Sequence, residues 1–238
     1  MVIYFSIERS VKSMMDTDFW PPLLLSFRLA ASATVLLLAL GTPLAYWLAL
    51  GKSRLRPLVH AVVSLPLVLP PTVLGFYLLL SLGPASHLGR WIESAFGARL
   101  VFSFGGLVIG SVIYSLPFMV HPIEAALAAL PTSLAEASCI LGKSRWETFW
   151  CVQLPNIRPA VLAGVVLSFA HTIGEFGLVL MIGGAIPGRT RVASIAVFNA
   201  VEAMDYGTAK RYALVLLAVT FPVLAALELY RRRSTQAF

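Results

Sequence analysis

Five long apolar runs constrain this chain more than any other feature of its sequence. A helix needs about 20 apolar residues to cross roughly 30 Å of hydrocarbon. We therefore expect five membrane-spanning helices, at Leu23–Leu50, Leu58–Leu82, Leu100–Val120, Ile157–Ile182 and Tyr212–Leu229. A further apolar stretch, Val192–Val201, is too short to span a membrane and is expected to be re-entrant or to lie at the interface.

The composition excludes the other classes of protein. Of the 238 residues, 58% are hydrophobic and only 12% are charged, whereas soluble domains carry about twice that share of charge. A soluble globular domain and a disordered chain are therefore both excluded. The apolar residues do not alternate, which argues against a β-barrel. The sequence predicts an all-α, polytopic membrane protein whose partners include membrane lipid.

The second predicted span carries three prolines, Pro66, Pro70 and Pro71. Proline inside a helix removes a hydrogen-bond donor and kinks the helix. We expect these prolines to break the span near its cytoplasmic third. A packing kink and a break that lines a cavity are both open interpretations.

The basic residues divide evenly between the two sides of the membrane. The formal net charge is +7, but the basic residues are scattered, so no nucleic-acid partner is expected. One side holds Lys52, Arg54, Arg56, Lys143, Arg145, Arg158, Arg231, Arg232 and Arg233, and the other holds Arg9, Lys12, Arg28, Arg90, Arg99, Arg189, Arg191, Lys210 and Arg211. The first set includes a short loop and a tail that lie directly against the membrane, which gives it more weight. We therefore expect the N-terminus outside and the C-terminus in the cytoplasm.

The first residues are not typical of a cleavable signal peptide, because the first apolar run is too long for one. The two cysteines, Cys139 and Cys151, lie in a segment expected in the cytoplasm, where thiols stay reduced. No Cys or His spacing is typical of zinc, so no metal site is predicted.

The segment 124–155 between the third and fourth spans is much more polar than its neighbours. We refer to it as the polar segment. Pro131 followed by Thr132 favours the start of a short helix, and Gly142 is well placed to end it. A second helix is expected to present Trp146, Phe149 and Trp150 as an aromatic stripe, and Leu154-Pro155 is expected to stop it. The segment is thus predicted to be a helix-turn-helix that projects from the membrane, either as a docking element or as an ordinary amphipathic loop.

Seven positions in this segment resemble a known motif, and five of them are identical to it. They are Glu136-Ala137-Ser138, Gly142 after three residues, and Val152-x-Leu154-Pro155 after nine more. The spacing is similar to the E-A-A-x3-G-x9-I-x-L-P motif of ABC importer permeases, with Ser138 and Val152 as conservative departures. The resemblance implies a type I ABC importer permease fold whose polar segment is the cytoplasmic coupling loop, with Glu136, Ala137, Ser138, Gly142, Leu154 and Pro155 facing the ATPase.

Three further stretches resemble permeases of the molybdate type, the ModB family. They are the proline-rich sequence 65–75, Gly174-Glu175-Phe176-Gly177 and Ile186-Pro-Gly-Arg-Thr-Arg191. The second is shared with sulfate permeases. The resemblance covers the chain from about Trp20 to Leu229. It implies a homodimeric permease in the bacterial inner membrane, two ATP-binding cassette subunits and a periplasmic molybdate-binding protein. Tungstate and sulfate remain open as substrates.

The chain is not expected to hydrolyse ATP. Gly51-Lys52-Ser53 and Gly142-Lys143-Ser144 are similar to the end of a P-loop, but that loop needs another Gly five residues earlier. Those positions hold Tyr46 and Ala137. With no catalytic constellation either, the chain is predicted to be a transport subunit without a cofactor, and ATP and Mg²⁺ are expected on the partner ATPase. An ATP-independent carrier or channel is the alternative.

Polar residues in the third and fourth spans are candidates for the pathway or the gate. Glu175 is expected to pair with His171 or an outer arginine and to brace the Gly174/Gly177 break, or else to act in gating. The hydroxyl-bearing candidates, which either contact a passing oxyanion or join helices, are Ser111, Ser115, Ser168 and Thr172.

Two outer arginines, Arg189 and Arg191, lie beside a glycine-rich stretch. They are expected to attract an anion or to contact a binding protein, or to be solvated loop residues. As domains we expect an extracytoplasmic segment at 1–19, an ABC transmembrane type-1 domain at 20–232 and a cytoplasmic tail at 233–238.

Overall fold

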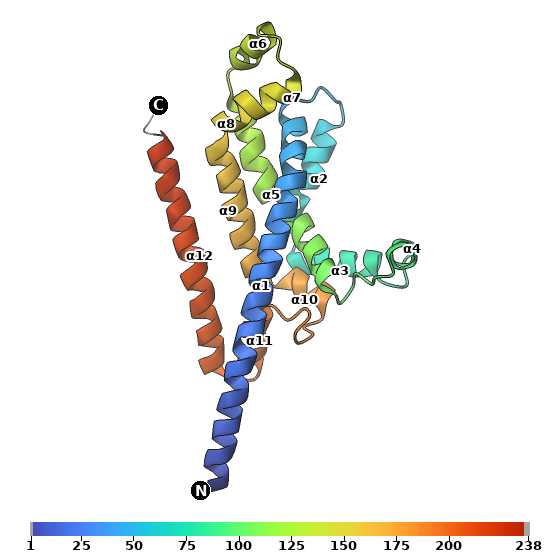
Figure 1. Cartoon of the computed structure of the whole chain (residues 1–238). Helices are drawn as coiled ribbons and strands as arrows, with labels where there is room; N and C mark the ends of the chain where they lie inside the picture. The colour runs from blue at the N-terminus through green and yellow to red at the C-terminus, as the bar shows by residue number, and fades with distance from the viewer. Residues whose placement is uncertain (1, 236–238) are drawn as a thin grey trace. The chain divides into compact units, whose positions relative to one another are not determined.

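The computed structural model describes residues 2–235, with side chains described from 19 to 231, and every regular element in that range is helical (Figure 1). The all-α prediction is therefore confirmed. The helices are α1 Val2–Leu50, α2 Arg56–Val68, α3 Pro71–Leu82, α4 His87–Phe96, α5 Phe104–Ala129, α6 Thr132–Ile140, α7 Arg145–Thr148, the π-helix η1 Phe149–Gln153, α8 Leu154–Asn156, α9 Arg158–Gly174, α10 Gly177–Gly183, α11 Ala193–Glu202 and α12 Tyr206–Thr235.

Three described helices are long and apolar enough to cross a membrane, at Phe19–Leu50, Phe104–Ala129 and Tyr206–Arg231. Two bent helix pairs, Arg56–Val68 with Pro71–Leu82 and Arg145–Asn156 with Arg158–Gly174, bring the count to five if each pair is one span. The number of predicted spans equals that upper count, but the second pair includes part of the polar segment and coincides with the fourth predicted span only over Arg158–Gly174. The short apolar stretch predicted at Val192–Val201 forms the ten-residue helix α11. Two predicted segments, 1–19 and 233–238, fall largely outside the described residues. Side chains are not described before Phe19 or after Arg231, and residues 236–238 are not described at all.

The second predicted span is broken at Leu69–Pro70, so the expected break is confirmed. Leu69 has extended backbone angles, φ −74° and ψ 136°, as expected for a residue that precedes proline. Pro66 stays inside α2, whereas Pro71 begins α3, a position where the missing N–H costs nothing. The break lies near the middle of Leu58–Leu82 rather than in its cytoplasmic third.

Two other predicted boundaries were wrong. The third predicted span ended at Val120, but α5 continues to Ala129 through an alanine-rich turn, because alanine is the best helix former. The fourth predicted span was continuous from Ile157 to Ile182, but α9 ends at Gly174 and α10 begins at Gly177.

Helix α4 has no counterpart among the predicted elements. Ser86 caps its start by accepting a hydrogen bond from the N–H of Gly89 at 2.8 Å, and Gly97 ends it at φ +66°. Leu88, Trp91 and Phe96 are exposed on it, at the i, i+3 and i+8 positions of one apolar face. This local signal was present in the sequence, but the helix is too short to meet the spanning threshold.

The chain divides into two compact units. The first combines residues 1–31, 71–111 and 172–218. In it α3 packs closely on α10, since a Cβ at Gly75 would lie 2.8 Å from Met181 Cβ and 3.0 Å from Leu178 Cα. Phe19 and Leu23 of α1 pack on α11 and α12, where Phe19 stacks on Tyr212 at 4.5 Å between ring centroids.

The second unit combines residues 32–70, 112–171 and 219–238. Its core is an apolar cluster in which the later half of α1 meets α2 and α5. The buried members are Leu37, Ala45, Leu48, Val63, Met119, Val120, Ile123, Leu127 and Ile157. The polar segment belongs to this unit, and its first six residues, 124–129, form the end of α5.

Candidate functional site

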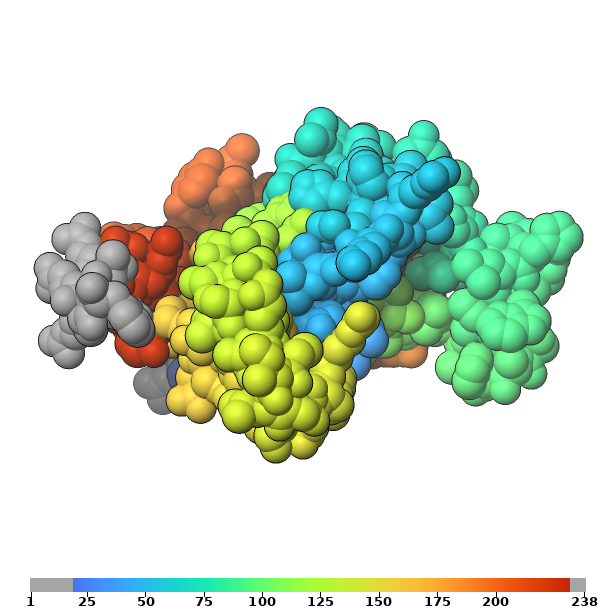
Figure 2. Space-filling view, turned by 90° about the horizontal axis from the view of Figure 1, so that it is seen from above, coloured from blue at the N-terminus to red at the C-terminus, as the bar shows by residue number. Residues whose placement is uncertain are grey.

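The polar segment folds as two short helical pieces, α6 and α7–η1–α8, between the long helices α5 and α9 (Figure 1). Seen from above, its residues, coloured yellow-green, stand on the surface facing the viewer (Figure 2). The predicted helix-turn-helix is therefore present, and its construction explains how a short segment holds one shape.

The turn after α6 is a Schellman motif centred on Gly142. The N–H of Gly142 donates to the carbonyl of Cys139 at 2.9 Å, and the N–H of Lys143 donates to the carbonyl of Ser138 at 3.1 Å. This pattern requires a left-handed residue at the glycine position, and Gly142 has φ +73°. The predicted role of Gly142 as the helix terminator is thus confirmed.

A capping box starts α7. The N–H of Glu147 donates to Ser144 Oγ at 3.2 Å, and the N–H of Ser144 donates to Glu147 Oε2 at 2.8 Å. Lys143 lies 3.3 Å from the other carboxylate oxygen. These contacts, above all the hydrogen bond from the Ser144 N–H, hold the pKa of Glu147 below its usual 4.5.

A buried hydroxyl pair joins the two helices. Ser138 Oγ and Thr148 Oγ1 lie 2.8 Å apart, and Thr148 also donates to the carbonyl of Ser144 at 2.9 Å. The Thr148 hydroxyl has one hydrogen, so Ser138 must be the donor between the two. Ser138, which stands where the related motif has alanine, therefore joins α6 to α7 through this hydrogen bond. We refer to the Ser138–Thr148 pair as the latch.

The outer face of the segment is apolar at its tip. Ile140 is 86% and Leu141 is 78% exposed, and the motif residues Glu136 and Ala137 are exposed beside them. Apolar side chains on an exposed tip are typical of a surface that binds another protein.

The expected aromatic stripe is present, because the rings of Trp146, Phe149 and Trp150 contact one another at 5.5–6.3 Å between centroids. Phe149 is buried and contacts Tyr46 edge-to-face at 5.1 Å, whereas Trp146 and Trp150 are exposed. The π-helix η1 begins at Phe149 and leads directly into α8. The predicted stop at Leu154-Pro155 lies one residue before the end of α8 at Asn156, where the chain bends by 76° into α9.

Glu175 lies in the break between α9 and α10 and is buried. Its Oε2 accepts a hydrogen bond from Ser111 at 3.0 Å, and its carbonyl accepts one from Ser194 at 2.6 Å. The carboxylate thus joins α5 to the break, and the break itself is held to α11. This arrangement favours the bracing role over gating.

His171, in the second unit, pairs with Ser115 at 2.9 Å and stacks on Phe118 at 4.2 Å between ring centroids. Because Glu175 belongs to the first unit, its expected pairing with His171 stays a prediction. The hydroxyl candidates Ser111, Ser115, Ser168 and Thr172 are all buried within the chain, which favours helix packing over direct contact with a passing anion.

The loop that holds Arg189 and Arg191 is built around Thr190. Thr190 Oγ1 donates to the carbonyl of Gly183 at 2.6 Å and accepts from the N–H of Ile186 at 2.9 Å. Arg189 is exposed and Arg191 is half-buried. A rigid loop with an exposed arginine is compatible with either expected role.

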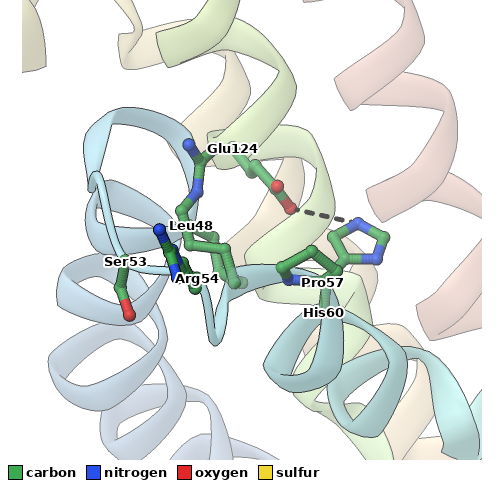
Figure 3. Close-up of a pocket in the computed structure, with 7 residues that line it drawn as sticks. Leu48, Ser53, Arg54, Pro57, His60 and Glu124 are labelled. Atoms are coloured by element: carbon green, nitrogen blue, oxygen red, sulfur yellow. Dashed lines mark ion pairs between the residues drawn. The ribbon is translucent and has the colours of Figure 1, made fainter.

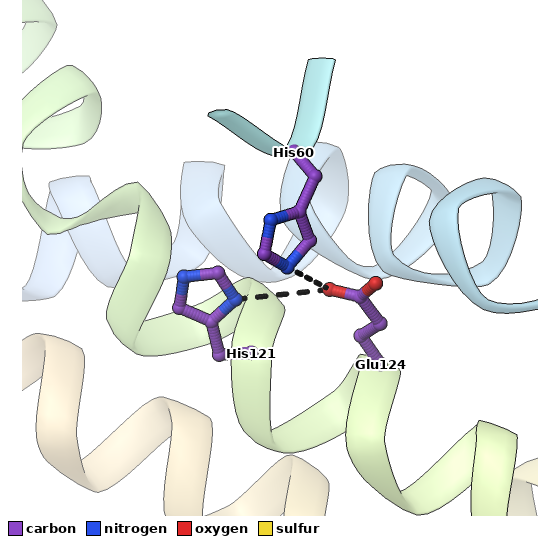
Figure 4. A group of neighbouring side chains, drawn as sticks. All are labelled: His60, His121 and Glu124. Carbon is purple, nitrogen blue, oxygen red and sulfur yellow. Dashed lines mark ion pairs between the residues drawn. The ribbon is translucent and has the colours of Figure 1, made fainter. Parts of the chain in front are cut away.

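One group of side chains was missed by the sequence analysis, which predicted no metal site. His60 on α2 meets His121 and Glu124 on α5 (Figure 4), and their ligand atoms lie within 4.8 Å of one another. His121 and Glu124 have a spacing of i and i+3, but His60 is 61 residues away, so no local pattern points to this group.

Comparison with known proteins decides the family. Residues 41–236 match the family described as "Binding-protein-dependent transport system inner membrane component". The chain belongs to this family. The permease is therefore a transport component of the inner membrane, as expected, and not an enzyme.

Curated relatives refine the comparison. The permease is 48% identical to the molybdenum transport system permease protein ModB of Azotobacter vinelandii over 87% of this chain and 92% of the relative. It is 34% identical to ModB of Escherichia coli over 77% of this chain and 80% of the relative. It is also 33% identical to the sulfate transport system permease protein CysT of Escherichia coli, over 75% and 64% of the two chains.

Solved structures support the fold alone. A chain from a bacterial ABC transporter involved in the import of the acidic polysaccharide alginate has a TM-score of 0.77 and 16% identity, with 95% of the permease and 83% of that chain covered. The expected type I ABC importer permease fold is thereby confirmed.

Proposed function

We propose that the permease is the membrane-spanning subunit of an ATP-driven importer that carries molybdate inward. The observation that carries this proposal is the 48% identity to the Azotobacter molybdenum permease over nearly its full length. The near-equal identities to the two Escherichia coli proteins, 34% and 33%, do not separate molybdate from sulfate. Tungstate and sulfate are therefore the competing substrates.

The energy source in this proposal is a separate ATPase. Two permease chains enclose a path, two ATP-binding cassette subunits hold ATP and Mg²⁺, and a periplasmic binding protein delivers the oxyanion. Closure of the ATPase pair moves the docked segments, and the spans change from inward-facing to outward-facing. Such a change needs a rigid element that transmits the motion.

The polar segment has the construction this docking role needs. Its latch and its two capped helices fix one shape, while Ile140, Leu141 and Glu136 stay exposed for the partner. Docking on a cytoplasmic ATPase requires the segment, and with it the C-terminus, to lie in the cytoplasm and the N-terminus outside. The basic loop at Lys52–Arg56 supports the same orientation.

Glu175 and its serine partners are assigned a bracing role at the Gly174/Gly177 break. Arg189 and Arg191 are assigned to the outer surface, where they contact the binding protein or attract the anion. Ser115 and His171 join α5 to α9 within the second unit. Ser168 and Thr172 are buried, and the Ser168 hydroxyl has no hydrogen-bond partner among the described residues.

Substrate competition tests the proposal. Uptake of labelled molybdate is measured in cells that lack other transporters for it, with excess unlabelled tungstate or sulfate. Molybdate uptake that resists a tenfold excess of sulfate is the expected result. Uptake of labelled sulfate that resists molybdate would instead assign the permease to sulfate.

A further inference from the structure

We propose that His60, His121 and Glu124 form a binding site for a divalent transition-metal ion of the zinc class. The site lies within the second unit, where the start of α2 passes the later part of α5. It has no role in the transport mechanism above and does not depend on the identity of the transported anion.

The three ligand atoms lie within 4.8 Å of one another. Nε2 of His60 lies 3.5 Å and Nδ1 of His121 lies 3.7 Å from the same carboxylate oxygen, Oε2 of Glu124 (Figure 4). Bonds of about 2.1 Å to a tetrahedral zinc ion place neighbouring ligand atoms about 3.4 Å apart. The two observed separations are close to that value, so an ion between them requires only small side-chain rotations.

The donor set selects the kind of metal. Two imidazoles and one carboxylate suit zinc and its neighbours in the first transition series, whereas Mg²⁺ and Ca²⁺ prefer oxygen ligands. Three protein ligands also leave one coordination position for water.

Ser64 orients one of the ligands. Its hydroxyl lies 3.2 Å from Nε2 of His121, the ring nitrogen that faces away from Glu124. When the Nε2–H donates to Ser64, Nδ1 keeps a free lone pair for the metal. A hydrogen bond of this kind behind a ligating histidine is the usual device that fixes its tautomer.

An ion can reach the site from solvent. A cavity of about 450 Å³ opens beside the cluster and is lined by His60 and Glu124 (Figure 3). Its other polar lining residues include Arg54 and Arg56. Arg56 donates to the carbonyls of Gly51 and Ala49 at 2.7 and 3.1 Å, so its charge is directed at the end of α1.

Metal binding would join two helices. His60 and Ser64 lie on α2, while His121 and Glu124 lie on α5, and Glu124 is the first residue of the polar segment. A bound ion would therefore hold α2 against the part of α5 that leads into the segment, and it would stabilise the folded chain by mass action.

The test uses the full-length permease in detergent micelles, with any polyhistidine tag removed. Zinc is titrated against a chromophoric chelator in the parent chain and in His60→Gln, His121→Gln, Ser64→Ala and His87→Gln. His87 is an exposed histidine on α4, so His87→Gln serves as the control. The parent and this control are expected to bind one Zn²⁺ per chain. Ser64→Ala is expected to weaken binding about 10-fold, and the two ligand variants are expected to weaken it further.

A second measurement guards against variants that fail to fold. Co²⁺ added to the parent chain is expected to give the visible absorption bands of a low-symmetry imidazole site, and Zn²⁺ is expected to raise its unfolding temperature. Absence of saturable zinc binding, or equal binding by the parent and both ligand variants, would overturn the proposal and leave the three residues as an ion-pair cluster.

Discussion

At the scale of single residues, the Ser138–Thr148 latch makes an asymmetric prediction. Ser138→Ala leaves Thr148 bonded to the Ser144 carbonyl, whereas Thr148→Val removes both bonds and leaves a buried Ser138 hydroxyl without a partner. Each lost bond costs about 1 kcal/mol, and an unsatisfied buried group costs more. Thr148→Val is expected to lower the free energy of unfolding more than Ser138→Ala, as measured by chemical denaturation in micelles.

The double variant is the control for this latch. Since both partners are then removed together, its loss is expected to be smaller than the sum of the two single losses. Strictly additive losses would show that the two hydroxyls do not interact.

Glu147 provides a pH prediction for the same segment. Its pKa is lowered in the folded chain, chiefly by the Ser144 N–H. Its ionised form therefore stabilises the fold above pH 4.5, and this contribution is lost as the pH falls through the lower folded pKa. Titration of ¹³C-labelled glutamate by NMR should give a midpoint below 4.5 for Glu147. Ser144→Ala keeps the backbone N–H and removes only the smaller side-chain contribution, so it should move the midpoint part of the way towards 4.5. A midpoint of 4.5 or above in the parent chain would contradict the capping box.

At the scale of elements, the turn between α6 and α7 depends on Gly142. A Cβ there meets no atom within 4 Å, so the cost of Gly142→Ala comes from the left-handed backbone alone, about 1 kcal/mol. Asparagine tolerates this conformation better, and proline excludes it and removes the N–H donor. We expect coupled ATPase activity and uptake in proteoliposomes to decrease in the order parent, Gly142→Asn, Gly142→Ala, Gly142→Pro. Full coupled transport by Gly142→Pro would exclude the docking role.

The packing of α3 on α10 gives a second prediction at this scale. A Cβ at Gly75 would meet Met181 Cβ and the Leu178 backbone at 2.8–3.2 Å, and the backbone has little room to move. Gly75→Ala is expected to lower stability by about 1–3 kcal/mol in thermal unfolding. The matched control is Gly105→Ala in α5, where the nearest atoms are 3.8 Å away. Equal effects of the two substitutions would contradict close packing of these helices.

The elements that sequence could predict are those governed by local chemistry. Pro70 and Gly142 act on their own backbone, so the break before α3 and the end of α6 were predictable. Prediction failed for contacts between residues that lie on different helices. His60 meets Glu124 only because α2 packs on α5, and Ser138 finds Thr148 only after the turn has formed. The π-helix η1 has no recognisable sequence signal.

At the level of the complete chain, the proposed permease forms a membrane path without its own energy source. Every feature of the polar segment, from the Schellman turn to the exposed Ile140 and Leu141, fits a rigid contact for a separate ATPase. The alternative, an ATP-independent carrier or channel, needs no such contact. An importer needs ATP and the ATPase for net transport, whereas a carrier or channel needs neither.

The most direct measurement is molybdate uptake into proteoliposomes that contain the permease and its ATP-binding subunits, with the binding protein outside and nucleotide inside. The account predicts accumulation against a gradient only when ATP, the ATPase and the binding protein are all present. Molybdate movement at the same rate through the permease alone, without nucleotide, would contradict it.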